Sequence, residues 1–378
     1  MDRKKFSKLL PGILFGVFLT HLSGQSIERV YIVSRVFPVN CQVDSGVPSS
    51  QPKYPVLDSE EAFLGLVVEF EKDNKKFFIS PWKKVIIGGK EIVTEAPEDF
   101  GLEQIKILWY KVEPVRGNKK TGFRYYSNED WVEKDGILKK IWHWDKLNYK
   151  EFVWDSSNTW IIKADVIPVE LDSHPFGTMR YKVEVKFNNQ MISSPGAESV
   201  KKDGDIDAHR ISVRGNTGNK IIDWAYSFFN LPFIWGSASR TGRPCEHQTE
   251  KYIGADCADF VVGIFRKAGY DMPYTGSQSL LHYANIIASP DSIDNKGFYI
   301  KNGARIKFDG NNNEAVIPGN IVLWSRHAAI LAFDNGNKFL DQDDIVIHTL
   351  FHEPTFEKIS NAYSGNFTIA RFKFNDND

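Results

Sequence analysis

Residues 254–269 read GADCADFVVGIFRKAG and predict a short buried helix with a cysteine in its first turn. Asp256 has the position of an N-cap, Asp259 follows three residues later as in a capping box, and Gly269 ends the helix. The residues that share one helical face include the cysteine: Cys257, Phe260, Val261, Ile264, Phe265 and Ala268.

The helix pattern allows two interpretations of Cys257. Backbone N–H groups and the positive end of the helix dipole favour a thiolate, which would lower the pKa of this cysteine and make it reactive. A free cysteine also behaves as a small hydrophobic residue, so a buried structural cysteine fits the same position. The helix pattern alone does not decide between a reactive and a structural cysteine, so the rest of the sequence is needed.

Composition indicates a folded protein with room for two domains. The chain has 378 residues, of which 42% are hydrophobic and 25% charged. The net charge of −1 gives no general attraction to nucleic acid, so no nucleic-acid partner is expected. No glycine-rich phosphate loop is present, and no cofactor is expected.

The N-terminus has the pattern of a secretory signal peptide. Basic residues precede an apolar stretch over residues 9–22, which is too short for a membrane span. We therefore expect residues 1–24 to be a signal peptide and the mature protein to be secreted or periplasmic, in the bacterial cell envelope, without a stable membrane span. An uncleaved N-terminal anchor is the alternative.

The chain contains three cysteines, an odd number for an exported protein. One assignment pairs Cys41 with Cys245 in a disulfide and leaves Cys257 reduced; three reduced thiols are the alternative. Cysteine and histidine are also common metal ligands, so Cys245, His247 and Cys257 could be read as a metal site. A structural zinc site would show tighter paired spacing, so no metal is expected.

The pattern of the chain predicts two domains joined by a linker. Residues 27–190 form an all-β sandwich or barrel, residues 191–218 are rich in Gly, Ser, Pro and charge, and residues 219–378 form an α+β domain. The strands predicted in the first domain are residues 30–33, 63–70, 76–79, 84–87, 105–112, 160–166 and 180–187. The second domain is predicted to have helices near residues 221–229, 257–268 and 277–287 and strands at 319–324, 327–333, 344–350 and 368–374. A short strand near residues 210–213 interrupts the linker.

Two histidines are suitable partners for Cys257. His327 opens one predicted strand and His348 lies near the end of another, so the imidazoles meet if the strands pair. A cysteine nucleophile needs a base and a group that orients the base. His327 would be the base and His348 the orienting residue, although each alone also fits an ordinary core or surface histidine.

Ordered motifs add a resemblance to a known family. The motifs are residues 231–236 (LPFIWG), 256–260 (DCADF), 318–324 (PGNIVLW), 327–331 (HAAIL) and 347–348 (IH). Their order resembles that of NlpC-type cysteine peptidases of bacterial cell walls. The resemblance covers residues 219–350 and implies a papain-like fold there, without explaining the N-terminal domain.

The resemblance also implies residue functions. Cys257 is similar to the family nucleophile, His327 to the base and His348 to the third catalytic residue. The backbone N–H of Cys257 would contribute to an oxyanion hole, and Asp256 would face a substrate amine. The residues that would contact substrate are Phe233, Trp235, Asp256 and Ala258.

The sequence also departs from the family pattern. Phe233 stands where the family usually has a tyrosine. Tyr226 or Tyr252 could supply the missing hydroxyl group. Ala258 and Asp259 replace serine and glycine, so the γ-D-glutamyl–diamino-acid bond usual for the family is not assured as the substrate.

The favoured function is that of an exported cysteine peptidase or amidase. It would cleave an amide bond in peptidoglycan stem peptide, or a related peptide, through a thioester acyl-enzyme. Two alternatives remain: an amidase or acyltransferase acting on another acyl substrate, and a wall-binding or adhesin protein with an idle papain-like module.

Overall fold

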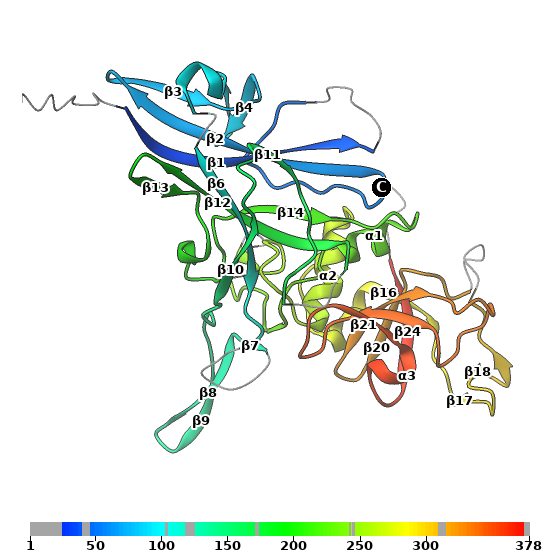
Figure 1. Ribbon diagram of the computed structural model, residues 1–378. Helices are drawn as coiled ribbons and strands as arrows, with labels where there is room; N and C mark the ends of the chain where they lie inside the picture. The colour runs from blue at the N-terminus through cyan, green and yellow to red at the C-terminus, as the bar shows by residue number, and fades with distance from the viewer. Residues whose placement is uncertain are drawn as a thin grey trace, which may run out of the picture.

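Figure 1 shows a computed structural model of the protein, with the N-terminal strands above and the C-terminal sheet below. The structure describes residues 25–39, 46–102, 105–117, 125–170, 174–241, 243, 246–308 and 315–373. The expected signal peptide of residues 1–24 lies outside the described residues. So do Cys41 and Cys245, the expected disulfide partners.

Strands dominate the chain, so the prediction of an α+β, papain-like fold for the C-terminal part is wrong. Strands account for 45% of the residues that the structure describes and helices for 11%. The described α-helices are short: α1 (Lys220–Tyr226), α2 (Cys257–Lys267) and α3 (Ile359–Ala362). Residues 277–287 are not a continuous helix, because η4 (Ser277–Tyr283) leads into β16 (Ala284–Ala288), which pairs with β24 (Phe367–Phe372).

The N-terminal half contains two main sheets around one apolar core, and every strand predicted there overlaps an observed strand. The first sheet consists of β1 (Gln25–Pro38), β2 (Glu60–Lys72), β3 (Lys75–Ile79) and β11 (Ile161–Lys163). The second consists of β10 (Tyr149–Asp155), β6 (Lys106–Pro114), β12 (Gly177–Phe187), β13 (Gln190–Ser193) and β14 (His209–Val213). β13 and β14 both pair with β12, so parts of the predicted linker belong to this sheet.

Smaller elements extend from this half and from the C-terminal sheet. The hairpins are β4 (Lys84–Ile87) with β5 (Lys90–Val93), and β8 (Glu129–Lys134) with β9 (Ile137–Trp142). Strands β17 (Ser292–Ile293), β18 (Tyr299–Lys301) and β19 (Ala304–Arg305) form a three-stranded sheet. Short 3₁₀ helices occur at η1 (Pro97–Phe100) and η2 (Ala197–Ser199). The β8–β9 hairpin projects away from the rest of the molecule in Figure 1.

The C-terminal half is built on a six-stranded antiparallel sheet in the order β16-β24-β20-β21-β22-β23. Its central strands are β20 (Ile321–Trp324), β21 (Ala328–Phe333), β22 (Ile345–His348) and β23 (Thr355–Lys358). Alternate residues of these strands face opposite sides. Ile321 and Ile330 pack with α1 and α2, whereas Val322 and Leu331 belong to the core on the other face.

Helix α2 forms where the sequence predicts it, with one difference at its start. The Asp256 carboxylate accepts hydrogen bonds from the N–H groups of Ala258 and Asp259, which is a standard N-cap. Gly269 has φ of +96° and, with Tyr270, closes the C-terminus through hydrogen bonds to two helix carbonyls. The Asp259 carboxylate does not complete a capping box, because it bonds to Ser237 and Ala238 instead.

The two halves are joined by buried polar contacts as well as by the chain. Strand β7 (Tyr126–Ser127) pairs in parallel with β15 (Ile234–Trp235). The Asn128 side chain donates to the carbonyls of Gly236 (3.0 Å) and the Gln248 side chain (2.8 Å). The loop before Cys257 is therefore positioned partly by the N-terminal half.

We predict that His209 makes stability fall on acidification. Burial lowers the pKa of His209 to about 3, whereas an unfolded histidine titrates near about 6.5. The unfolded state therefore binds the proton first. The contribution of His209 to stability is complete above about pH 6.5 and declines as the pH falls towards about 3, by about 1.4 kcal/mol per pH unit.

Urea unfolding at about pH 7 and about pH 5 would measure this effect. His209→Gln should lose less unfolding free energy between the two pH values than the wild type, and the exposed His282→Gln should behave like the wild type. Equal losses in the wild type and His209→Gln would contradict the prediction.

Candidate active site

Cys257 is the first residue of α2 and is a buried, reduced cysteine. Its burial, and then the neighbouring Asp256 carboxylate, raise the pKa of the thiol to about 12, although the N–H of Ala328 acts in the opposite direction. The prediction of a partly ionised thiolate is therefore wrong for this structure. Burial outweighs the helix dipole, so the nucleophile needs a base at the moment of reaction.

His327, His348 and Glu357 form a continuous hydrogen-bonded chain, here called the His–His–Glu chain. His327 Nε2 lies 2.9 Å from His348 Nδ1, and His348 Nε2 lies 2.8 Å from Glu357 Oε2. His327 directly precedes β21, His348 ends β22, and Glu357 lies on β23. Antiparallel pairing of these strands brings the three side chains together, as predicted for the two histidines.

The His327 ring is held in a fully buried aromatic setting. It stacks on Tyr363 with a centroid distance of 5.2 Å and lies 5.5 Å from the Trp324 ring. Burial lowers the pKa of His327 to about 3, and burial also lowers that of His348 to about 4 although Glu357 opposes this. Both imidazoles are therefore neutral at physiological pH, as a general base must be.

The second nitrogen of His327 is available. Among the residues that the structure describes, His327 Nδ1 is buried and has no hydrogen-bond partner. The next residue along the chain, Ala328, directs its backbone N–H at the Cys257 thiol. The thiol therefore lies near the start of β21, one residue along the chain from His327.

Asp256 supports the helix rather than presenting an open carboxylate. Besides the two cap bonds, its Oδ2 accepts the N–H of Gly236 at 3.0 Å. The Asp256 carboxylate, which was expected to face a substrate amine, therefore already accepts hydrogen bonds from three backbone N–H groups. Burial raises the pKa of Asp256 and, together with the charge of Asp256, that of Asp259.

The other expected substrate residues have different surroundings. Phe233 is buried and packs against the rings of Tyr125 and Phe351, so it offers no surface to a ligand. Trp235 is 41% exposed and donates from Nε1 to Glu129 at 2.9 Å. Ala258 lines a cavity of about 550 Å³ at the N-terminus of α2.

This cavity is the best candidate for a substrate site. Glu129, Arg240 and Arg266 contribute charged groups to its wall, and Glu129 forms ion pairs with Arg240 and Lys140. Because Glu129 is the first residue of the projecting β8–β9 hairpin, the N-terminal half contributes to the cavity. No motif or spacing in the N-terminal half indicates this contribution.

Neither tyrosine proposed to replace the missing hydroxyl is available. Tyr252 is fully buried, stacks on Phe228 and shares a hydrogen bond with Ser227. Tyr226 packs in the apolar core against Phe176. The backbone N–H of Cys257 remains the candidate oxyanion donor.

Two groups bear on metal binding. His247 is remote from such a role, because its Nδ1 accepts the N–H of Ser239 and its ring packs on Tyr274; Cys245 lies outside the described residues. His348, His352 and Glu357 offer ligand atoms that all lie within 4.8 Å of one another. Neither Glu357 nor His352 was expected from the sequence.

Comparison of the chain with models of known protein families, with curated proteins and with solved structures found no match. In the ranges that the structure describes, no helix is sufficiently long and apolar to cross a membrane.

We predict that Cys257 in the native protein reacts slowly with iodoacetamide near neutral pH, because its raised pKa keeps it a thiol. The measurement is peptide mapping after timed labelling of native and urea-unfolded protein. Cys257 should label at least about tenfold faster once unfolded. Faster labelling in the native state would show that the resting cysteine is ionised.

Proposed function

We propose that the protein is a cysteine hydrolase that cleaves an amide bond in bacterial cell-wall peptide. One observation carries the proposal: the buried His–His–Glu chain ends in an unpartnered His327 Nδ1, and the backbone N–H of the next residue, Ala328, lies near the Cys257 thiol. A buried polar atom without a partner is costly, and such atoms are often retained at functional sites. The proposal depends on this site and not on a papain-like fold.

The hydrogen bonds of the chain support a specific tautomer of His327. The Glu357 carboxylate can only accept, so His348 donates from Nε2 and its Nδ1 has the lone pair. His327 then donates from Nε2 to His348, which leaves the lone pair of His327 on Nδ1. This is the tautomer that can take a proton from Cys257.

The reaction follows from this arrangement. His327 Nδ1 removes the thiol proton as Cys257 Sγ attacks the carbonyl carbon, and the N–H of Cys257 at the start of α2 stabilises the oxyanion. The intermediate collapses to a thioester when His327 returns the proton to the leaving amine. His327 then deprotonates a water molecule, whose attack on the thioester releases the carboxylic acid and restores the thiol.

The substrate assignment rests on two supports. The cavity at the N-terminus of α2 combines acidic and basic groups with the Tyr274 side chain, which suits a charged peptide. The order of the motifs around Cys257 and His327 resembles that of NlpC-type cell-wall peptidases. Secretion to the cell envelope, expected from residues 1–24, is part of the same proposal.

Purified peptidoglycan is the direct test. Incubation with the full chain should release fragments with new amino and carboxyl ends, detected by mass spectrometry. Cys257→Ser, which keeps the shape of the side chain, should release fewer than about one hundredth of them. Undiminished release by Cys257→Ser would overturn the mechanism, and transfer or cleavage of another acyl group would redirect the substrate assignment.

We predict a graded loss of kcat along the His–His–Glu chain. His327→Ala should lower kcat by about 10²–10⁴, because the base is lost. His348→Ala should cost less, and His348→Gln should retain more activity than His348→Ala, because a polar side chain can still orient the ring. Single-turnover acylation rates give the ranking, and equal losses for His327→Ala and His348→Ala would contradict it.

Glu357→Gln should also lower kcat, since an amide can donate to His348 Nε2 and stabilise the wrong tautomer. Glu353→Gln is the matched control: this carboxylate lies four residues earlier and pairs with Arg116, outside the His–His–Glu chain. An equal effect of the two substitutions would argue against a specific function for Glu357.

A further inference from the structure

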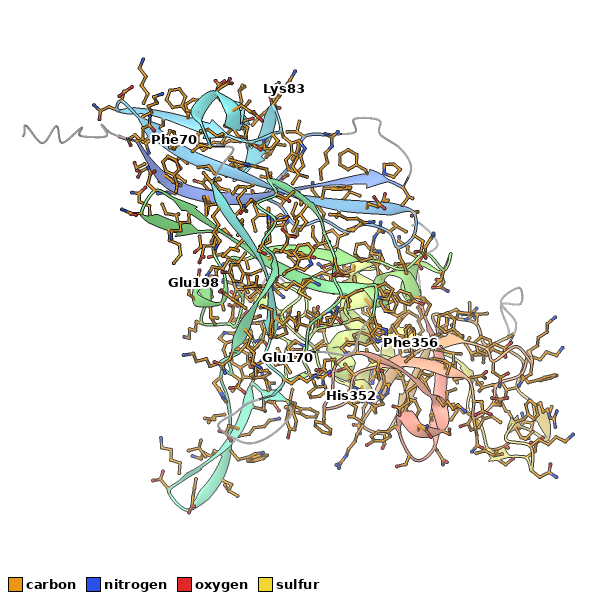
Figure 2. The ribbon with its side chains drawn as sticks, in the orientation of Figure 1. Phe70, Lys83, Glu170, Glu198, His352 and Phe356 are labelled. Carbon is orange, nitrogen blue, oxygen red and sulfur yellow. The ribbon has the colours of Figure 1, made fainter. Side chains whose placement is uncertain are left out.

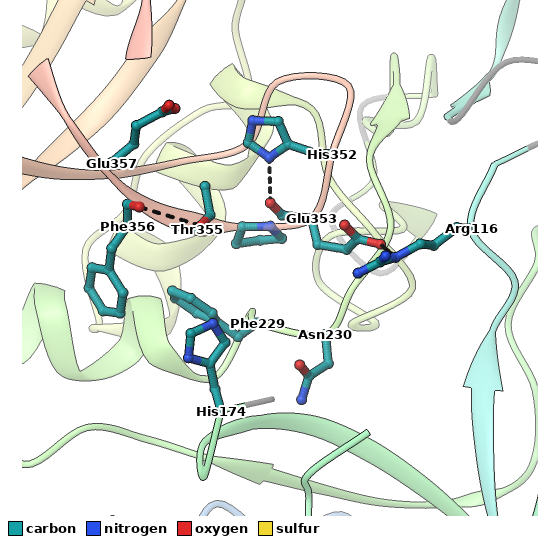
Figure 3. Close-up of a pocket in the computed structure, with 10 residues that line it drawn as sticks. Arg116, His174, Phe229, Asn230, His352, Glu353, Thr355, Phe356 and Glu357 are labelled. Atoms are coloured by element: carbon teal, nitrogen blue, oxygen red, sulfur yellow. Dashed lines mark hydrogen bonds and ion pairs between the residues drawn. The ribbon is translucent and has the colours of Figure 1, made fainter. Parts of the chain in front are cut away.

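The hairpin that supplies the last two members of the His–His–Glu chain also supplies a third ligand-type residue. His352, labelled in Figure 2, lies between β22 and β23, and its ring centroid is 5.1 Å from that of His348. Figure 3 shows Glu357 and His352 on the same side of the chain, opposite Phe356. Together with His348, they form the cluster whose ligand atoms lie within 4.8 Å of one another.

The hydrogen bonds of His352 prepare it as a ligand. Its Nδ1 lies 2.7 Å from the Glu353 carbonyl oxygen, which can only accept. His352 therefore donates from Nδ1 and has its lone pair on Nε2. A hydrogen bond from the second ring nitrogen to a carbonyl is the usual support of a metal-binding histidine.

The set of donors suits zinc. Two imidazoles and one carboxylate are ligands that Zn²⁺ accepts at bond lengths of about 2.0–2.2 Å, with a fourth position for water. His348 Nε2 and Glu357 Oε2 are 2.8 Å apart, and Glu357 is one-third exposed and can adjust. His352 and Glu357 also line an open cavity of about 260 Å³, which offers a route for the ion (Figure 3).

We propose that His348, His352 and Glu357 form a site for a divalent transition-metal ion such as Zn²⁺, and that occupancy switches the cysteine site off. The inhibitory part of this proposal rests on the proposed hydrolase function. The metal-binding part does not.

The switch follows from the shared imidazole. An ion on His348 Nε2 takes the lone pair of that nitrogen, so the ring proton must move to Nδ1. His348 then donates to His327 Nε2, and the proton of His327 moves to Nδ1. Both rings remain neutral and no proton is lost from them. His327 Nδ1 now holds a hydrogen and cannot accept the thiol proton of Cys257.

Zinc titration of the full chain by calorimetry tests binding without reference to activity. The wild type and Glu353→Gln should bind one Zn²⁺ at this site, and His352→Ala should bind it at least about 100-fold more weakly. Cys257→Ser should bind with unchanged affinity, which separates this site from capture by the reactive thiol. Wild-type affinity in His352→Ala would overturn the site.

Hydrolysis assays then test the switch. Saturating Zn²⁺ should lower wild-type activity at least about tenfold, and a chelator should restore it. His352→Ala should have wild-type activity without metal and should keep it when Zn²⁺ is added. Inhibition of His352→Ala equal to that of the wild type would overturn the switch. Specific binding without hydrolysis by the metal-free protein would instead count against the proposed function alone.

Discussion

The Asp256 carboxylate is the contact on which the candidate site depends. Its two oxygens accept from the first turn of α2 and from Gly236, so one half-buried group fixes both the helix start and the strand that precedes it. Cys257 is placed by this cap, opposite the start of β21. The cap also has an electrostatic effect, because a carboxylate next to the thiol disfavours the thiolate.

Local patterns predicted much of the secondary structure, and the sheet explains what they missed. Apolar runs marked β2 and β21, alternating apolar residues marked β12, and the spacing around Cys257 marked α2 together with its two end residues. Residues 277–287 have helical spacing but become a strand in part, because pairing with β24 satisfies their backbone. A local window of sequence does not contain the partner strand, so it does not reveal long-range pairing of this kind. The expected α+β class failed for the same reason.

The site was predicted to a similar extent. Two histidines on strands that could pair were sufficient to place His327 and His348 together. Glu357 was not found, because its position depends on the register of β22 and β23, in which Glu357 lies opposite Val346 and on the same face as His348. The thiol pKa was misjudged because the dipole of a helix is visible in sequence, whereas the burial of its first residue is not.

The parallel pairing of β7 with β15 limits how this protein could have been assembled from modules. A hydrolase unit that met its neighbour only through a linker could be exchanged between chains. Here Asn128 and Glu129 complete the loop and the cavity next to Cys257 from the other half of the molecule. Changes in the projecting hairpin would therefore reach the cysteine site directly, so the two halves are expected to have diversified together as one heritable unit.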